Sequence, residues 1–523
     1  MKRTEILDTT LRDGAQAEGI SFSVEDKIKI ARTLDDFGID VIEVGFPGAN
    51  PKDEEFCAKM KDVPLKHSVL CAFSSTVKFG EDPKLSSVIQ RLVRAETPAV
   101  AVFGKASKNQ ARDIMGISPD ENLEIIEKTV SYLRSLGKRV IFDAEHFYAA
   151  YREDEKYAVA VLECAKNAGA DTLCLCDTKG DVLPLDAYHI TGCIVSMLPD
   201  VKIGVHFHDD TGCASACSLL AAEAGASQIQ GTFLGFGERC GNADLSVIIP
   251  TLHFKSGYTF PSDMKTLTKT AKKIAEICNV RIRNNKPYTG KSAFGHKAGM
   301  HIDGVKKAES SFEHISPAEV GNRRKFLLSE MSGRSTLLER VRLLVPGARP
   351  DSGELALALE ALKEKEHYGY QYEAAEASLH LLLSRTLGLY KPHFNVLLYK
   401  TTDDFPSANG NLTSCATIQI EVDGKTETSA SLGNGPVNAL DLALRRALTV
   451  FYPRVEEMKL VDFKVRVIDA STTTAAKVRV LIETTDGKEV WTTVGVSYDI
   501  IEACFTALID SFEYKLMNIE KNS

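Results

Sequence analysis

One short pattern recurs through the first half of this 523-residue chain: an amphipathic helix, a glycine and then an apolar strand. The glycines at these junctions are Gly38, Gly137, Gly169 and Gly225. A glycine just past the end of a helix adopts the left-handed conformation that other residues resist. Repeated alternation of helix and strand predicts parallel strands that are joined by helices.

We predict eight strands, which begin near Glu5, Asp40, His67, Ala99, Arg139, Asp171, Lys202 and Gln228. Most are short apolar runs, as expected for strands that are buried on both faces. Eight strand–helix units within about 265 residues match the usual size of a TIM barrel, the closed (β/α)8 fold. A doubly wound open sheet has the same local pattern and is the structural alternative.

The chain divides into three predicted regions. Residues 1–265 form the barrel, residues 266–375 are helical and charged, and residues 376–523 form an α+β domain with an internal duplication. Each copy has a strand, a turn at Asp423-Gly424 or Asp486-Gly487, a second strand and a helix. The copies contain no cluster of catalytic residue types, which favours a role in regulation or assembly.

Composition excludes several classes of function. A formal net charge of -8 disfavours nucleic-acid and anionic-membrane partners, which attract basic surfaces. No apolar run is long enough to span a membrane, and the strand pattern begins too early for a signal peptide. We therefore expect a cytoplasmic protein whose 12 cysteines are reduced thiols.

Polar residues that end the predicted strands are candidates for chemistry, because barrel enzymes place their active sites there. His206 and His208 lie two residues apart on a strand and face the same way, and Asp13 follows the first strand. Such polar residues also occur by chance, but two imidazoles and a carboxylate at one rim favour a divalent-ion site. Asn242, after the eighth strand, is close enough to reach the same ion. A 2-keto acid can fill open coordination positions, where the ion polarises its keto carbon.

Four further side chains lie at the same rim. Arg12 can hold a substrate or a developing oxyanion through its planar fork of donors. Glu43 can orient Arg12 and so take part in substrate binding, or it can form an ordinary barrel ion pair. Glu145 is a candidate proton carrier and Thr178 a candidate substrate anchor. Taken singly, each of Glu145, Thr178 and Asn242 is better explained by a solvated loop or capping role.

Three segments taken together resemble the α-isopropylmalate, homocitrate and citramalate synthases. They are Asp8–Gly14, His206–His208 and Gly237–Asn242. Lys297–Gly304 is similar to the accessory catalytic segment of that family, and the duplicated region is similar to its regulatory domain. The resemblance covers the whole chain.

The resemblance implies that Asp13, His206 and His208 are metal ligands, with Asn242 a near neighbour or further ligand. It does not distinguish Mg, Mn, Zn or Co. It also implies acetyl-CoA as co-substrate and a homodimer with shared active sites. The family commonly has Asn at the position of Asp209, a departure that concerns the shape of the pocket rather than the ligands.

The resemblance also implies roles for the remaining site residues. Arg12 corresponds to the residue that stabilises charge on the substrate. Glu145 and His301 correspond to acid/base residues, Thr178 to a substrate-binding hydroxyl, and Asp303 to a residue that supports the site. An amino acid at the end of the pathway is implied as a feedback inhibitor, and isoleucine is the first candidate.

Within this family, Asp143–Phe147 and Val102–Lys105 look most like the citramalate synthases. This implies an acyltransferase that condenses acetyl-CoA with pyruvate to give (R)-citramalate and CoA, on a route to isoleucine. The alternative is 2-isopropylmalate synthase, which uses 2-ketoisovalerate on the leucine route. One or two methyl groups separate the two substrates, a difference of about 1–3 kcal/mol in an apolar pocket.

Two other classes fit the chain less well. A metal-dependent acyl-CoA lyase would have a similar barrel, but the Glu238-Arg239 segment and the duplicated domain favour a synthase. An amino-acid-binding protein without catalysis would have little reason to keep Arg12, Asp13 and the two histidines together.

Overall fold

The structure is a computed structural model that describes residues 2–47, 49–326, 334–404, 413–468 and 476–521. The chain forms two compact units. The first comprises residues 1–294 and 313–324, and the second comprises residues 295–312 and 325–523.

The first unit contains a closed barrel of eight parallel strands in sequence order. The strands are β1 (Glu5–Asp8), β2 (Val41–Gly45), β3 (Val69–Ser75), β4 (Ala99–Lys105), β5 (Arg139–Glu145), β6 (Thr172–Asp177), β7 (Lys202–Phe207) and β8 (Gln228–Gly231). The barrel closes where β1 pairs with β8, with Leu7 opposite Gln230. The predicted barrel is therefore confirmed, and the open-sheet alternative is wrong.

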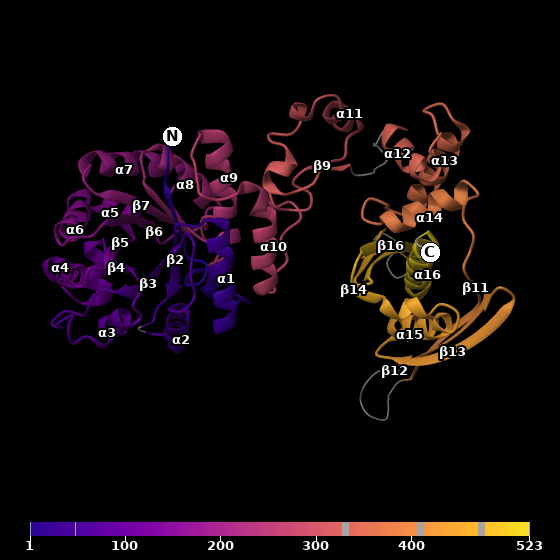
Figure 1. Ribbon diagram of the computed structural model, residues 1–523, viewed down its shortest axis with the longest axis horizontal. Helices are drawn as coiled ribbons and strands as arrows, with labels where there is room; N and C mark the ends of the chain where they lie inside the picture. Colours follow the sequence, from indigo (N-terminus) through magenta and orange to yellow (C-terminus); the bar gives the residue numbers. More distant parts are fainter. Residues whose placement is uncertain (1, 48, 327–333, 405–412, 469–475, 522–523) are drawn as a thin grey trace. The chain divides into compact units, whose positions relative to one another are not determined.

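Helices surround the strands of this barrel (Figure 1). They are α1 (Val24–Phe37), α2 (Pro51–Met60), α3 (Ser87–Arg94), α4 (Pro119–Ser135), α5 (Phe147–Glu153), α6 (Glu155–Asn167), α7 (Pro184–Met197), α8 (Ala214–Glu223), α9 (Leu245–Ser256) and α10 (Leu267–Ile277). The four glycines that were predicted to end helices have positive φ, between 75° and 106°. At Gly38 the need is also steric, because a β-carbon would lie 2.9 Å from the backbone nitrogen of Ser262.

Helix α10 belongs to the barrel unit, because Leu267, Ala271 and Ile274 pack in the same core as the barrel helices. The predicted boundary at residue 265 thus falls inside this unit. Residues 266–375 contain little strand. Apolar residues such as those of α10 recur at helical spacing and bury one face of a helix.

The barrel interior is filled by side chains in layers. A mainly apolar layer comprises Leu7, Val41, Cys71, Ala99, Ala101, Ile141, Cys174 and Cys176. Nearer the amino ends of the strands, Arg139 Nη1 donates to Glu5 Oε1 at 2.8 Å. Polar side chains also gather toward the carboxyl ends, the end at which barrel enzymes carry their chemistry.

The second unit begins with a short parallel pair of β9 (Gly295–His296) and β10 (Lys325–Phe326). Its helices before the duplicated region are α11 (Gly299–Lys307), α12 (Arg334–Leu344), α13 (Gly353–Tyr368) and α14 (Glu376–Thr386). Leu355, Ala358 and Leu362 of α13 pack in a core with Leu379 and Leu383 of α14. This region is mainly helical, as predicted.

The duplicated region consists of two three-stranded antiparallel sheets, each followed by a helix. The first copy is β11 (Asn395–Asp404), β12 (Thr413–Val422), β13 (Lys425–Gly433) and α15 (Pro436–Thr449). The second is β14 (Lys459–Val467), β15 (Val478–Thr485), β16 (Val490–Ser497) and α16 (Ile500–Lys521). The predicted hairpin-and-helix repeat is present, with an additional strand, β11 or β14, at the start of each copy.

The two hairpin turns differ in length. Val422 pairs with Lys425 across the two-residue Asp423-Gly424 turn. In the second copy Thr485 pairs with Val490, so four residues form the loop. The Asp-Gly pair therefore marks both turns but sets a tight two-residue connection only in the first.

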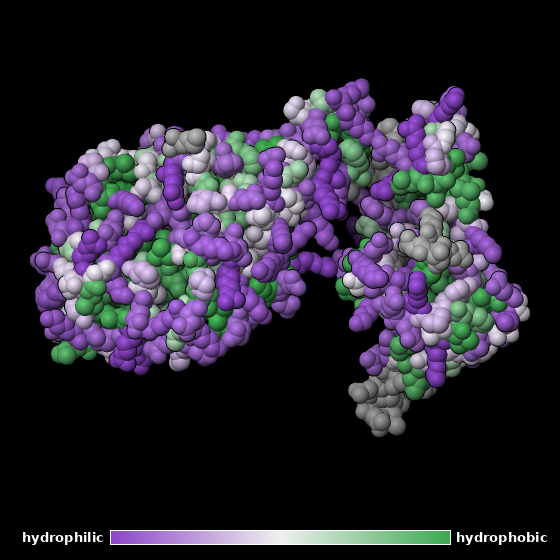
Figure 2. All heavy atoms as spheres, viewed as in Figure 1, coloured by the Kyte–Doolittle hydropathy of each residue, from purple (hydrophilic) through white to green (hydrophobic). Residues whose placement is uncertain are grey.

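The surface in the view of Figure 2 is mostly hydrophilic, with scattered apolar side chains. Among the residues that the structure describes, no helix combines the length and apolar character that a bilayer crossing requires. All 12 cysteines are free thiols, as predicted.

Candidate active site

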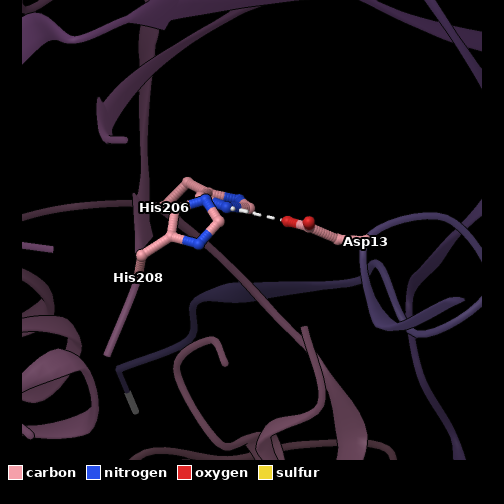
Figure 3. Close-up of side chains that lie close together, drawn as sticks. All are labelled: Asp13, His206 and His208. Atoms are coloured by element: carbon pink, nitrogen blue, oxygen red, sulfur yellow. Dashed lines mark ion pairs between the residues drawn. The ribbon is translucent and has the colours of Figure 1, made fainter. Parts of the chain in front are cut away.

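The mouth of the barrel brings a carboxylate and two imidazoles together. Asp13 lies in the loop after β1, His206 is on β7, and His208 follows that strand directly. One possible ligand atom from each of the three lies within 4.8 Å of the others. Figure 3 shows the His206 and His208 rings beside the Asp13 carboxylate, and His206 Nε2 is 3.2 Å from Asp13 Oδ2. All three side chains are buried.

Burial and neighbouring charges shift the pKa values of Asp13 and His208. Burial alone would raise the pKa of Asp13, but the charges of Arg12 and His206 outweigh it and hold this pKa below its usual range. Burial, reinforced by the adjacent His206, lowers the pKa of His208 to about 4. His208 is therefore neutral at neutral pH, the form in which an imidazole nitrogen can bind an ion.

Asn242 lies next to this cluster in the loop after β8. It forms an isolated antiparallel bridge with His208, and its Nδ2 donates to the carbonyl oxygen of Phe236 at 3.2 Å. Its Oδ1 is buried and has no hydrogen-bond partner among the described residues. A β-carbon on Gly237 would overlap this amide, which explains the glycine at that position. The arrangement leaves an amide oxygen available beside the two imidazoles.

Arg12 is held from several sides. Its Nε donates to Glu43 Oε2 at 2.5 Å, and its guanidinium carbon lies 4.0 Å from the ring centroid of Phe73. Its Nη1 is 3.5 Å from Asp13 Oδ2. The predicted pair with Glu43 is present. It uses Arg12 Nε, so the terminal nitrogens of the guanidinium remain beside the cluster of Asp13 and the two histidines. A role for Glu43 in substrate binding stays a prediction.

Glu145 ends β5 at the same mouth. Lys105, which ends β4, is its register partner, and Lys105 Nζ lies 2.6 Å from Glu145 Oε2. His146 follows with φ of 62°, a left-handed conformation that is uncommon outside glycine. Its backbone N–H donates to Thr178 Oγ1 at 2.9 Å. Because this oxygen accepts a bond from the backbone, the hydroxyl hydrogen of Thr178 remains for another acceptor.

His301 and Asp303 belong to α11 in the second unit. The His301 ring stacks on Phe312, with 4.2 Å between centroids. Asp303 is exposed and forms an ion pair with Lys307 at 2.6 Å. Their roles at the barrel mouth stay predictions, since these contacts lie within their own unit.

Four side chains of the mouth were not predicted as site residues: Phe73, Lys105, Asp143 and Gln230. Lys105 could have been found, because it ends an apolar strand just as Glu145 does. Asp143 and Gln230 are polar residues within strands whose neighbours are apolar, which is itself a signal. No comparable signal exists for Phe73, since an aromatic residue in a barrel strand normally indicates core packing.

Three family models match successive parts of the chain. The model described as HMGL-like matches residues 3–279. The model described as homocitrate synthase post-HMGL domain-like matches residues 288–366. The model described as LeuA allosteric (dimerisation) domain matches residues 373–516.

Curated relatives match over nearly their whole length. The (R)-citramalate synthase of Aquifex aeolicus is 48% identical over 99% of this chain and 99% of its own. The (R)-citramalate synthase of Synechocystis sp. is 42% identical over 98% and 96%. A probable 2-isopropylmalate synthase of Methanopyrus kandleri is 32% identical over 97% of both chains.

Proposed function

The chain belongs to the HMGL-like family and groups there with the (R)-citramalate synthases, and from this premise we propose that its barrel condenses acetyl-CoA with pyruvate. The products are (R)-citramalate and CoA, so the protein is an acetyl-CoA-dependent acyltransferase. We place the reaction at the barrel mouth because Asp13, His206 and His208 cluster there beside Arg12. The 2-isopropylmalate synthases are the less similar relatives, which disfavours 2-ketoisovalerate as the substrate.

The residues of the cluster fit a divalent ion. One carboxylate and two imidazoles are a donor set that leaves coordination positions open, and the buried Oδ1 of Asn242 needs a partner that no described residue supplies. We therefore assign Asp13, His206 and His208 as ligands, with Asn242 as a further one. A bound divalent ion would supply Lewis acidity toward the keto group of pyruvate.

Arg12 stabilises the negative charge that develops on the keto oxygen when the new carbon–carbon bond forms. Its guanidinium is held by Glu43 and Phe73, so little reorganisation is needed as the charge appears. The free hydrogen of the Thr178 hydroxyl is suited to a carboxylate oxygen of the substrate.

Proton transfer at the thioester is assigned jointly to Glu145 and His301. A base removes a methyl proton from acetyl-CoA, the resulting enolate carbon attacks the keto carbon, and the new alkoxide takes up a proton. Water then cleaves the thioester, which releases the carboxylate and the CoA thiol. The pair with Lys105 holds the Glu145 carboxylate at the mouth. Asp303, two residues from His301, is assigned to support this acid/base site and substrate binding.

The C-terminal region is the proposed site of dimerisation and feedback control. Its match to the LeuA allosteric (dimerisation) domain supports this assignment. We assign catalysis to residues 1–265, a contribution to the active site to the accessory region 266–375, whose first helix packs with the barrel unit, and regulation to residues 376–523. Isoleucine is the first candidate inhibitor. Isoleucine, leucine and valine at millimolar concentration should be compared, and no inhibition by any of them would contradict control by these amino acids.

A thiol-release assay tests the proposed reaction. Chelator-treated protein is supplied with acetyl-CoA, one divalent ion at a time, and a panel of pyruvate, 2-ketobutyrate and 2-ketoisovalerate. We expect pyruvate to have the highest kcat/KM, with (R)-citramalate as the product on a chiral column. Preference for 2-ketoisovalerate would contradict the proposal, as would turnover that is unchanged by removal of divalent ions. His208→Ala is the inactive control.

A further inference from the structure

A line of buried hydrogen bonds runs from the cluster into the barrel wall. His206 Nδ1 lies 3.0 Å from Oε1 of Gln230, its register neighbour on β8. Gln230 Nε2 donates in turn to Asp143 Oδ1 of β5, also at 3.0 Å. Asp143, His206 and Gln230 are all buried. The line therefore joins the imidazole nitrogen that faces away from Asp13 to a carboxylate on another strand.

The chemistry of the three groups sets the direction of each hydrogen bond. An ionised carboxylate can only accept, so the Gln230 amide must turn its NH2 toward Asp143. Its oxygen then faces His206, and an oxygen can only accept. His206 must therefore carry a hydrogen on Nδ1, so Nε2 is the nitrogen that would hold a divalent ion. This is the nitrogen that lies 3.2 Å from Asp13 Oδ2.

A second acceptor holds the same amide. Gln228 Oε1 lies 3.4 Å from Gln230 Nε2, and Gln228 Nε2 donates to Glu5 Oε2 at 2.6 Å. The Glu5 carboxylate is itself held by Arg139. Because Glu5 can only accept, Gln228 must turn its NH2 toward Glu5 and its oxygen toward Gln230. Charged groups on other strands therefore orient both glutamine amides.

We propose that Gln230 and Asp143 are positioning residues that hold His206 in the tautomer with hydrogen on Nδ1, so that Nε2 is ready for the divalent ion. The proposal rests on the proposed function only for the presence of that ion. Polar side chains in a barrel core cost free energy unless they are paired, and here the pairing ends on a predicted metal ligand. Removal of a residue that hydrogen-bonds to a metal ligand, here called an outer partner, commonly lowers metal affinity or activity about 10–100-fold.

The first test replaces Gln230 with a residue of similar length that cannot accept a hydrogen bond. In Gln230→Met, His206 Nδ1 loses its acceptor, and we expect binding of Mn²⁺, measured by calorimetry without substrate, to weaken about 10–100-fold. Thr172→Val is the matched control. Thr172 is buried on β6 and its hydroxyl has no hydrogen-bond partner among the described residues, so this variant should bind Mn²⁺ as the wild type does.

The second test exchanges the amide and the carboxylate. Gln230→Glu alone sets two carboxylates against each other, and Asp143→Asn alone removes the charge that orients Gln230. In the double variant the new amide at position 143 can donate to the new carboxylate at position 230, and that carboxylate can accept from His206 Nδ1. We expect the double variant to bind Mn²⁺ at least about tenfold more tightly than Gln230→Glu, since outer-partner effects are of this size. A purely steric role would not produce such a rescue.

The tautomer can be measured directly in the metal-free protein. The side-chain ¹⁵N shifts of His206, assigned by comparison with His206→Ala at alkaline pH, should show hydrogen on Nδ1 in the wild type and a mixture in Gln230→Met. Absence of hydrogen on Nδ1 in the wild type would overturn the proposal, as would unchanged Mn²⁺ affinity in Gln230→Met. If the wild type shows the Nδ1 hydrogen but binds no divalent ion, the metal assignment fails while the orientation of His206 stands.

Discussion

Arg12 and Glu43 form a hydrogen-bonded ion pair inside the barrel mouth, with 2.5 Å between Arg12 Nε and Glu43 Oε2. Glu43 is fully buried and Arg12 is largely so. The guanidinium is thus held at its Nε by Glu43 and over its flat face by Phe73. The pair therefore does more than balance charge, since it directs the remaining donors of Arg12 toward Asp13.

Arg12→Lys should fail even though it keeps the positive charge. An ammonium group cannot reproduce the planar fork or its stacking on Phe73. We expect kcat to fall by about 10²–10³-fold, the usual effect of removing one group that stabilises an oxyanion. Steady-state kinetics with pyruvate would measure this. Arg134→Lys, at an exposed pair with Asp171, is the control, and near wild-type kcat in Arg12→Lys would contradict the role of the fork.

Glu43→Gln should lower both stability and turnover. The substitution keeps the shape of the side chain but removes the nearer of the two carboxylates that balance the charge of the buried Arg12 guanidinium. We expect the free energy of unfolding to fall by about 1–3 kcal/mol, measured by urea denaturation, together with a loss of kcat. Unchanged stability would show that Asp13 alone balances the charge of Arg12.

His208→Ala should abolish divalent-metal binding and turnover without unfolding the barrel. Its side chain leaves the strand end at the mouth and contributes little to the core. We expect Mn²⁺ affinity to fall by at least about 10²-fold, in keeping with the loss of a ligand rather than of an outer partner. Circular dichroism should be unchanged. A fully metallated, active variant would refute the assignment of His208 as a ligand.

Glu145→Gln should separate proton transfer from substrate binding. The amide can still pair with its surroundings but cannot take up a proton, so kcat should fall about 10²–10⁴-fold while the KM for pyruvate changes little. Thr178→Val is the contrasting variant, for which we expect mainly a raised KM. If Glu145→Gln changed KM alone, the residue would be a binding group.

The barrel could be predicted because its signals are local. Each helix end carries its own glycine, and each strand buried on both faces is a short apolar run. The strands β11 and β14 were missed because they are edge strands whose residues lie largely in solvent. In β14, however, the alternation of Phe463, Val465 and Val467 with charged residues was a usable signal.

The site was predictable to the extent that chemistry follows position along a strand. His206 and His208 share a face because they are two residues apart, and Asp13 was placed beside them by the barrel itself. The bond between Gln230 and Asp143 was not predictable in this way. It links β8 to β5 across the interior, so it depends on barrel diameter and register, which no local pattern specifies.

The pair of Glu5 and Arg139, near the amino ends of the barrel strands, offers a test of how stability depends on pH. Burial alone would raise the pKa of Glu5, but the hydrogen bonds and charge of Arg139 outweigh it and lower this pKa from its ordinary value of 4.5. The folded state therefore releases this proton more readily than the unfolded state does. The stabilisation is fully present above the ordinary pKa and is lost as the pH falls through the lower, folded value.

Glu5→Gln should cost about 1.5–3 kcal/mol in free energy of unfolding at pH 7, the range for hydrogen bonds to charged groups. The cost should become progressively smaller as urea denaturation is repeated toward pH 3. Glu25→Gln, at an exposed pair with Lys59, should cost little at any pH. A Glu5→Gln penalty that stayed constant across this range would show that the pair acts through packing and not through charge.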